Sequence, residues 1–415
     1  MRCAAAVRVA ALIAGAIALA ACGSKPDTGD RIAGTTLTIY SSLPMHGASS
    51  QNAQAVLSGE TLALLQAHQR IGKYRIVLKP LDDSTPKRAE WDPAQTTINA
   101  RSAVADRSTI GYIGEFNSGA SAVSIPLLNR AGIAQISPTS TAVGLTTGGP
   151  GASPGEPDKY YPTKARTFAR IVPNDAVQAI AQVRLQKGLG CTKVYVLDDG
   201  EVDGSDAATS FSIAAKQAGL NVVGVEAFDP RASDYSPVAK AVAQTHADCV
   251  MLGAITESNA VLVTKQIAAA VPNARIFGSA GVAESTYTNP ADGGLPKGID
   301  PRVMITVATL APNAYPPSGR AFYVQYTRQY GAPQPYAIYG YEAMSLMLSA
   351  IAQATDRGTG PARRSEVVAA LFGTRDRRSV LGTYSIEKTG DTTLRRYGVY
   401  RIVGGHLSFW TAMTG

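Results

Sequence analysis

The chain has 415 residues, of which 45% are hydrophobic and 17% are charged. This balance excludes a disordered chain, which could not bury a core, and a polytopic membrane protein, which needs several long apolar spans. The length exceeds what one hydrophobic core usually serves, so we expect two compact lobes. The four histidines are far apart in the sequence, so we expect no His/Cys metal cluster (His46, His68, His246, His406).

The N-terminus indicates export and a lipid anchor. A basic start precedes the apolar run Val9–Ala21, which is too short to span a bilayer as a helix and is typical of a signal peptide. The run ends in Leu-Ala-Ala followed by Cys22, which resembles the lipobox of a bacterial lipoprotein. We therefore predict a signal peptide at 1–21, lipidation of Cys22 and a flexible, polar tether at 22–35. The alternative is an ordinary signal peptide with an incidental cysteine.

The positive charge does not indicate a nucleic-acid partner. Lys and Arg number 39 against 31 Asp and Glu, a formal charge of +8. Cleavage before Cys22 removes Arg2 and Arg8, so 8 − 2 leaves +6. The remaining basic residues are scattered, apart from Arg375–Arg378 and Arg395–Arg396, for which a solvated surface is the simpler interpretation. An exported lipoprotein is also separated from chromosomal DNA by the membrane.

From Thr36 onward, short apolar runs alternate with stretches whose apolar residues recur at helical spacing. The predicted strands and helices of this first series are, in order, Leu37–Ser41, Gln51–Arg70 (helix), Arg75–Leu81, Pro93–Ala105 (helix), Ile110–Gly114, Gly119–Arg130 (helix) and Ile133–Ser137. Such an order predicts a mostly parallel sheet covered by helices on both faces. The segment Gly148–Pro162, rich in Gly and Pro, then interrupts the series as a surface insertion or a hinge-flanking loop.

A second series of the same kind follows. Its predicted strands are Lys193–Asp198, Asn221–Glu226, Asp248–Gly253 and Arg275–Ser279, and its helices are Ser205–Gly219, Ser236–Thr245 and Ser258–Ala270. Arg302–Thr309 is another apolar run. Later helices near Pro316–Tyr330, Pro335–Thr355 and Arg363–Phe372, and final strands at Thr383–Ile386 and Tyr397–Val403, fit neither sheet alone. The chain is therefore expected to cross between two lobes more than once. Open α/β sheets bind ligands beyond the carboxyl ends of their strands, so a ligand cleft is expected between the lobes.

Several short segments stand in a recognisable order along residues 36–405. They are Ile113–Gly119 (IGEFNSG), Leu128–Ile133 (LNRAGI), Ile136–Thr141 (ISPTST), Val196–Asp199 (VLDD), Ala247–Gly253 (ADCVMLG), Tyr339–Ala343 (YGYEA) and Gly382–Ser385 (GTYS). Together they resemble the type I periplasmic binding proteins of the leucine/isoleucine/valine-binding group, which deliver ligands to ABC importers. The resemblance implies an α/β fold of two Rossmann-like lobes with parallel sheets, joined by three crossovers.

The resemblance also implies where the lobes divide. It places the crossovers near Val172–Asn174, Thr306–Pro312 and Ser379–Thr383. The first lobe then consists of residues 36–172 plus 310–380, and the second of residues 173–309 plus 381–415.

The first lobe of this family holds a ligand's α-carboxylate. It does so with a Ser after the third strand, matched here by Ser118 next to Asn117, and with a Ser/Thr-rich turn after the fourth strand, matched by Thr139 and Thr141. Hydroxyls and free N–H groups at helix N-termini can bind an anion without burying a second charge. The alternative is that Ser118 and Thr141 only cap the helices that follow them.

The second lobe departs from the amino-acid-binding pattern. Where these relatives carry a Glu for the ligand ammonium, the sequence has Ala280, and where they carry Tyr it has Ile255 and Asp203. A buried ammonium needs a partner, which Asp203, Glu257 or Glu284 could supply, although each can also be a solvated loop acid. We therefore expect an amino acid or a related carboxylate or amide, with no commitment to a branched-chain amino acid.

Cys191 and Cys249 are predicted to form a disulfide. Each stands at the start of a predicted strand of the second lobe, and in a sheet of order 2-1-3-4-5 the first and third strands are neighbours. Both cysteines would then lie at the same end of adjacent strands, within bridging range. Closing a loop of about 58 residues stabilises the fold by roughly 4 kcal/mol in the chain-entropy model. The alternative is a pair of buried free thiols.

These inferences describe an exported, lipid-anchored binding protein. We expect a monomer without enzymatic activity, cofactor or metal, whose partners are a small ligand and the permease subunits of an ABC importer. One alternative is a ligand-sensing lipoprotein of the same fold. A remote alternative is a penicillin-recognising serine enzyme, because Ser84–Lys87 matches S-x-x-K and Lys388–Gly390 matches K-T-G. Pro86 favours a loop rather than a helix at the first motif, and the sequence has no S-D-N.

Overall fold

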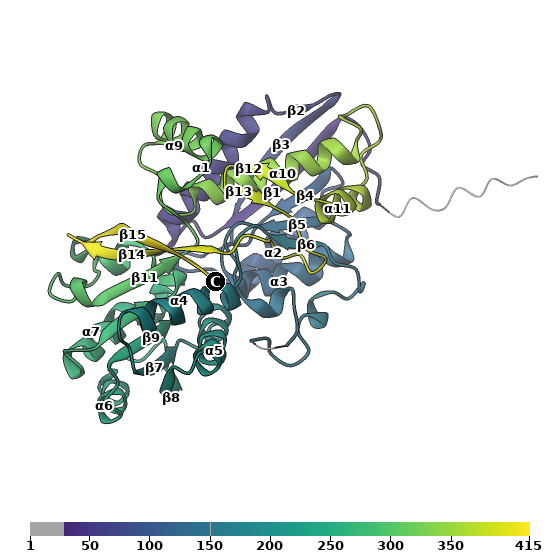
Figure 1. The fold of residues 1–415 in the computed structure, drawn as a ribbon. Helices are drawn as coiled ribbons and strands as arrows, with labels where there is room; N and C mark the ends of the chain where they lie inside the picture. Colours follow the sequence, from purple (N-terminus) through teal and green to yellow (C-terminus); the bar gives the residue numbers. More distant parts are fainter. Residues whose placement is uncertain (1–28, 150) are drawn as a thin grey trace, which may run out of the picture.

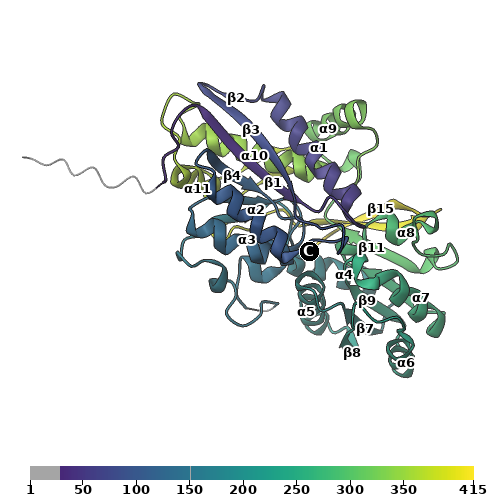
Figure 2. The same ribbon diagram turned by 180° about the vertical axis from the view of Figure 1, so that it is seen from behind.

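The computed structural model describes residues 29–149 and 151–415. The predicted signal peptide and Cys22 lie outside these residues. In the described ranges, no helix is both long enough and apolar enough to cross a membrane. The chain folds into two lobes, one above the other in Figure 1 and seen from behind in Figure 2.

The first lobe is built on a six-stranded sheet of order β2-β3-β1-β4-β5-β6. Its neighbouring strands are all parallel except the β2/β3 pair. The strands are β1 (Thr36–Leu43), β2 (Arg70–Ile71), β3 (Tyr74–Asp82), β4 (Thr109–Ile113), β5 (Ala134–Ser137) and β6 (Phe168–Arg170). Every residue of β4 and β5 is buried, as expected for central strands covered on both faces.

Helices from two distant parts of the sequence cover this sheet (Figure 1). They are α1 (Ser50–Gln66), α2 (Pro93–Ala105) and α3 (Ser118–Arg130), joined by α9 (Pro317–Tyr330), α10 (Ala337–Ala354) and α11 (Arg364–Phe372). Helices α1 and α10 approach each other through two glycines. A Cβ atom on Gly59 would lie 2.2 Å from the carbonyl oxygen of Ala337, and one on Gly340 would lie 2.2 Å from that of Val56. The close contact therefore requires glycine on both helices.

The second lobe contains a seven-stranded sheet of order β15-β14-β11-β10-β9-β7-β8. Its strands are β7 (Lys193–Asp198), β8 (Asn221–Ala227), β9 (Cys249–Gly253), β10 (Arg275–Gly278), β11 (Val303–Val307), β14 (Arg396–Val403) and β15 (His406–Thr414). Its helices are α4 (Asp175–Gly188), α5 (Val202–Gln217), α6 (Ser236–Gln244), α7 (Val261–Ala270) and α8 (Ser285–Thr288). Strands β7 to β11 are mutually parallel, and the hairpin β14–β15 adds an antiparallel edge.

The predicted disulfide is confirmed. Strands β7 and β9 are neighbours, and Cys249 stands opposite Val194 in their register. Cys191 and Cys249 are bonded, with their Cα atoms 5.8 Å apart, and both side chains are buried. The bond therefore joins the same ends of two adjacent parallel strands.

The lobes are connected by three segments, and the third lies later than predicted. The first two are residues 171–174 and 308–316. In place of a third crossover at Ser379–Thr383, the structure has a hairpin of β12 (Arg377–Ser379) and β13 (Gly382–Tyr384). Glu342 on α10 holds this hairpin on the first lobe, because it accepts hydrogen bonds from Arg377 (2.6 Å) and Tyr384 (2.7 Å). The hairpin spans the predicted boundary at 380/381, and the third connection is residues 385–395, between β13 and β14.

The first lobe also begins earlier than predicted. Ile32 is buried and donates its N–H to the carbonyl of Ala362 at 2.9 Å. The Asp30 side chain accepts the N–H of Ser365, at the start of α11, at 2.7 Å. Residues 30–32 are thus attached to the lobe, whereas we predicted a flexible tether up to residue 35.

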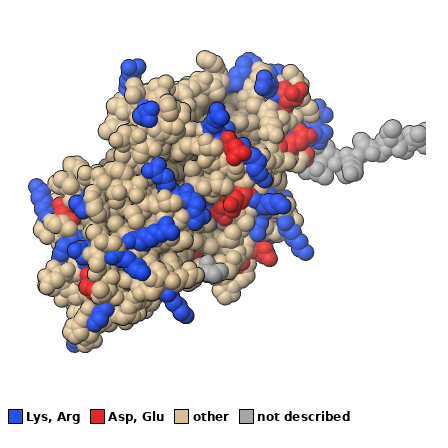
Figure 3. Space-filling view, in the orientation of Figure 1, with Lys and Arg blue, Asp and Glu red and all other residues tan. Residues whose placement is uncertain are grey.

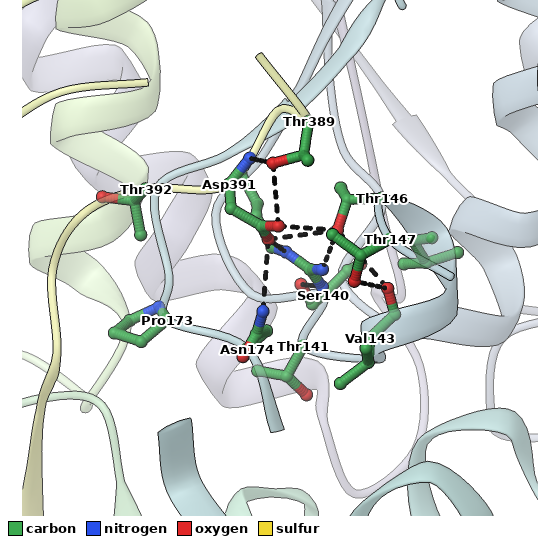
Figure 4. Close-up of polar contacts among 12 residues, drawn as sticks. Ser140, Thr141, Val143, Thr146, Thr147, Pro173, Asn174, Thr389, Asp391 and Thr392 are labelled. Carbon is green, nitrogen blue, oxygen red and sulfur yellow. Dashed lines mark hydrogen bonds and ion pairs between the residues drawn. The ribbon is translucent and has the colours of Figure 1, made fainter. Parts of the chain in front are cut away.

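A buried ion pair joins the first and third connections (Figure 4). Arg170, at the end of β6, is fully buried, and its Nε lies 2.7 Å from Oδ1 of Asp391. The same guanidinium donates to the carbonyl of Ala142 at 2.6 Å, and Thr146 donates to Asp391 at 3.0 Å. One side-chain cluster therefore links the loop after β5 with both connecting segments.

Candidate ligand-binding site

A small cavity of about 30 Å³ lies between the lobes, beyond the carboxyl ends of strands from both sheets. Its first-lobe wall follows β1, β4 and β5 and consists of Ser49, Asn52, Phe116, Asn117, Thr139 and Thr141. Its second-lobe wall consists of Asp203, Ile255, Ala280, Gly281 and Glu284. Tyr336, immediately before α10, completes the lining. The strand-end rule thus placed the cavity correctly.

The structure brings most of the predicted ligand residues together. Those that line the cavity are Asn117, Thr139, Thr141, Asp203, Ile255 and Ala280. Ser118 stands behind them, fully buried, and its hydroxyl accepts the N–H groups of Thr141 (3.1 Å) and Ala142 (3.2 Å). Of the other candidate acids, Glu284 lines the cavity and Glu257 contacts Ser49 next to it. A direct contact between a ligand and any of these residues stays a prediction.

The expected anion-binding position holds a carboxylate of the protein itself. Oδ1 of Asp203 accepts hydrogen bonds from the hydroxyls of Ser118 and Thr141, both at 3.0 Å. Asp203 lies in the first turn of α5 on the second lobe, so these bonds cross the cleft. The third predicted hydroxyl does not take part, because Thr139 donates to the carbonyl of Phe116 at 2.6 Å.

Local hydrogen bonds explain how the first-lobe wall is shaped. The Ser137 hydroxyl, at the end of β5, accepts the N–H groups of Thr139 (3.2 Å) and Ser140 (2.8 Å) and turns the chain sharply. The N-cap of α3 is Asn117, and Ser118 is the first helical residue. Thr141 precedes Ala142, which is the N-cap of a short 3-10 helix. Neither Ser118 nor Thr141 is therefore the simple helix cap that the alternative interpretation supposed.

Further hydrogen bonds join the lobes around the cavity. Oε1 of Glu257 accepts both the N–H (3.0 Å) and the hydroxyl (2.9 Å) of Ser49. On the other side, the N–H of Val143 donates to Asp206 at 2.9 Å. The two lobes are thus in direct contact on both sides of the cavity, which is a closed arrangement.

The cavity is acidic. Burial raises the pKa of Asp203, although hydrogen bonds from Ser118 and Thr141 oppose the shift. Burial, followed by repulsion from Glu257, raises the pKa of Glu284 well above its usual range, and burial also raises the pKa of Glu257. No Lys, Arg or His is among the residues that line the cavity.

A second pair of acids lies beside Asp203. Burial raises the pKa of Asp206 to about 7, and it raises that of Asp175 well above its usual range, where the charges of Asp203 and Asp206 add to the effect. The first residue of α4, Asp175, thus faces the first turn of α5. Two adjacent carboxyl groups in a buried site do not both ionise readily, so this pair takes up protons at a higher pH than free carboxyl groups do.

Sequence reasoning missed five lining residues, one of which, Gly281, directly follows the predicted Ala280. Ser49 and Asn52 lie beyond the carboxyl end of β1, a position to which the strand-end rule also points. Phe116 lies in the loop after β4, and its ring packs edge-on against that of Tyr336 with centroids 5.8 Å apart. Tyr336 had no local signal, because it follows no strand and lies between α9 and α10.

The serine-enzyme motifs do not form a catalytic site. Ser84 follows β3 in a bridge to Trp91, and its hydroxyl contacts Asp82. Lys87 is exposed in a turn, not one helical turn beyond Ser84. Thr389, from the K-T-G match, hydrogen-bonds Asp391 in the third connection. Both matches are therefore local turn structure.

The basic residues form no single patch on the face shown in Figure 3. Lys and Arg are spread over both lobes on that face, with Asp and Glu among them. This agrees with the scattered basic residues of the sequence.

Two α/β lobes, three connections and a polar cavity between facing strand ends define the class of two-lobe solute-binding proteins. The chain belongs to the periplasmic binding protein family, whose model matches residues 36–406. The family is one of extracytoplasmic binding proteins and not of enzymes. No curated protein sequence matches the chain closely enough to count as a relative.

Solved structures share this fold at low sequence identity. The leucine-binding protein LivK from Thermotoga maritima has a TM-score of 0.76 and 19% identity, over 91% of this chain and 99% of that one. LivJ from Streptococcus pneumoniae, in complex with isoleucine, has a TM-score of 0.71 and 17% identity over 92% and 99%. An R. palustris solute-binding protein, in complex with 4-hydroxybenzoate, has a TM-score of 0.72 and 16% identity over 91% and 97%.

Proposed function

We propose that the protein is the solute-binding component of an ABC importer. It captures a small polar ligand between its lobes and delivers it to the permease subunits in the membrane. The observation that carries this proposal is the interlobe cavity, to which both lobes contribute buried polar side chains. A ligand that contacts both walls favours the closed form by its difference in affinity for the open and closed states.

The sequence predicts an amino acid or a related carboxylate or amide as the ligand. LivK and LivJ support the amino acid, and the R. palustris protein supports an aromatic carboxylate. The contact of Asp203 with Ser118 and Thr141 argues against a carboxylate in this chain, because their hydroxyls already hold an anion. An ammonium group agrees better with the acidic walls.

We also propose that lipid on Cys22 attaches the mature protein to the outer face of a bacterial membrane. The supporting feature is the sequence before Cys22, with its short apolar run and small residues. Metabolic labelling with a radioactive fatty acid tests the anchor. The wild-type chain should become labelled and sediment with membranes, and Cys22→Ser should not.

The binding function is tested by thermal shift and calorimetry on the purified protein. Small amines, amino acids, amides and carboxylates are added one class at a time. At least one class should raise the melting temperature, because a ligand that binds only the folded state stabilises it. Small-angle scattering should then show a smaller radius of gyration with that ligand than without it.

A further inference from the structure

We infer that the ligand is a small organic cation without a carboxylate group, held by Asp203 and Glu284 and flanked by Phe116 and Tyr336. This inference rests on the proposed function, because it assigns a ligand chemistry to the same interlobe cavity. Three independent features of the cavity support it.

The first feature is the occupied anion site. Ser118 and Thr141 are the hydroxyl donors expected to hold a ligand carboxylate, and both donate to Asp203 instead. The Ser118 hydroxyl is also fixed by the N–H groups of Thr141 and Ala142, so its one hydrogen points at Asp203. A ligand carboxylate in this place would have to displace a buried charge of the same sign.

The second feature is an unpartnered carboxylate oxygen. Glu284 is only 6% exposed and lines the cavity, and its Oε2 has no hydrogen-bond partner among the described residues. Oε2 of Glu257, next to it, is likewise buried without a partner in the described part of the chain. An ammonium group donates up to three hydrogen bonds and carries the opposite charge, so it satisfies such oxygens directly.

The third feature is aromatic. The rings of Phe116 and Tyr336 both line the cavity, and they meet edge-on at 5.8 Å. The face of an aromatic ring attracts an organic cation, and the attraction grows when water is excluded. Acids and aromatic rings together, with no basic residue in the lining, are a composition suited to a cation.

In a different interpretation, Asp203 occupies the place of a ligand carboxylate, and the ligand displaces Asp203 when it binds. The two interpretations predict opposite results for Asp203→Asn. If the ligand is a cation, the substitution removes a binding charge and weakens binding. If Asp203 competes with a ligand carboxylate, the substitution removes the competitor and strengthens the binding of amino acids or carboxylates.

The test is titration calorimetry with four classes of probe at about pH 8. The cations are ethanolamine, putrescine and choline, the zwitterion is leucine, the anion is benzoate and the neutral compound is acetamide. A cation should bind to the wild-type protein more tightly than the other classes. Asp203→Asn and Glu284→Gln should each weaken that binding at least about tenfold. Asp234→Asn, on an exposed acid of the same lobe outside the cavity, is the matched control and should bind like wild type.

A second measurement does not depend on variants. Asp203 and Glu284 have Glu257, Asp175 and Asp206 as neighbouring acids, and burial raises the pKa of all five. A bound cation therefore competes with protons, so its affinity should rise between about pH 6 and about pH 8. The affinity of an anion would fall over the same range. Wild-type titrations at both pH values thus report the sign of the ligand charge.

The outcomes separate the inference from the proposed function. If leucine or benzoate binds and no cation does, the inference of a cationic ligand is wrong, but the protein is still a solute-binding protein. The same holds if leucine or benzoate binds more tightly to Asp203→Asn than to the wild type. Preference for acetamide overturns it in the same way. If no class binds, the proposed function itself fails. The inference is supported if a cation binds best, binds more weakly to both variants and binds more tightly as the pH rises.

Discussion

The buried ion pair between Arg170 and Asp391 should contribute several kcal/mol to stability. Arg170 is fully buried, so the substitution Asp391→Asn leaves a cation in the interior without its counter-charge. Asparagine keeps an oxygen that can accept from Nε of Arg170, but the attraction between charges is lost. Two unit charges 4 Å apart interact by about 4 kcal/mol at an effective dielectric constant of 20. Breaking one side of a buried pair costs about 3–5 kcal/mol in general, so we expect about 3–4 kcal/mol here.

The sign of the pH dependence follows from Asp391. Burial alone would raise the pKa of Asp391, but the charge of Arg170 and hydrogen bonds from Arg170, Thr146 and Thr389 hold it below its usual value. A depressed pKa contributes stability above the unfolded-state value of about 4, and this contribution disappears as the pH falls through the folded-state value. The free energy of unfolding of the wild type should therefore exceed that of Asp391→Asn by the full amount at pH 7. The difference should become progressively smaller below about pH 4.

Urea unfolding followed by fluorescence measures this difference. The matched control is Glu366→Gln, because Glu366 pairs with Arg363 at 3.8 Å on the surface and such a pair contributes about 1 kcal/mol or less. Replacing both partners, as in Arg170→Met with Asp391→Leu, should cost less than Asp391→Asn alone, since no unpaired charge remains. A loss below about 1 kcal/mol in Asp391→Asn, or a double variant less stable than the single one, would refute the reasoning.

Three further predictions concern stability away from the cleft. Removing the disulfide by Cys191→Ala with Cys249→Ala should lower the free energy of unfolding by about 4 kcal/mol for a sequence separation of 58 residues, and equal urea midpoints for oxidised and reduced wild type would contradict this. Burial raises the pKa of Glu60 to about 8, so wild-type stability should fall as the pH rises from about 5 to about 8, and Glu60→Gln should make that fall smaller in thermal melts. Gly340→Ala should separate α1 from α10 and lower the melting temperature, whereas Gly188→Ala, where an added Cβ meets no atom within 4 Å, should not.

The alternation of strands and helices was predictable because buried parallel strands are continuous apolar runs. Helix α4 was not predicted, and its buried face explains why. Gln178, Gln182 and Gln186 are all buried there, so the helix lacks the usual apolar stripe. Gln178 donates to the carbonyl of Thr306 at 2.9 Å and Gln182 to that of Gly278 at 3.1 Å. These glutamines satisfy carbonyls of the second sheet, a role that periodicity of apolar residues cannot reveal.

Other elements and contacts differed in how clearly the sequence indicates them. The hairpin β14–β15 had a signal in Gly404 and Gly405, which both adopt positive φ (62° and 86°) in its turn, but it was not recognised. The contact of Ser118 with Asp203 had no such signal, because it joins two lobes across 85 positions of sequence. The resemblance to a family identified both residues as site residues, but it could not show that one would bind the other.

The acids of the cleft connect lobe closure to the charge of the ligand. Closing the lobes removes Asp203, Glu257 and Glu284 from water, beside Asp175 and Asp206, and burial raises the pKa of each. Without a ligand, closure near neutral pH must therefore take up protons or desolvate unpaired carboxylates, and both carry a cost in free energy. A bound cation replaces those protons and lowers that cost, so its affinity includes the relief of repulsion as well as direct contacts. An acidic cleft of this kind makes the closed form depend on the ligand that occupies it.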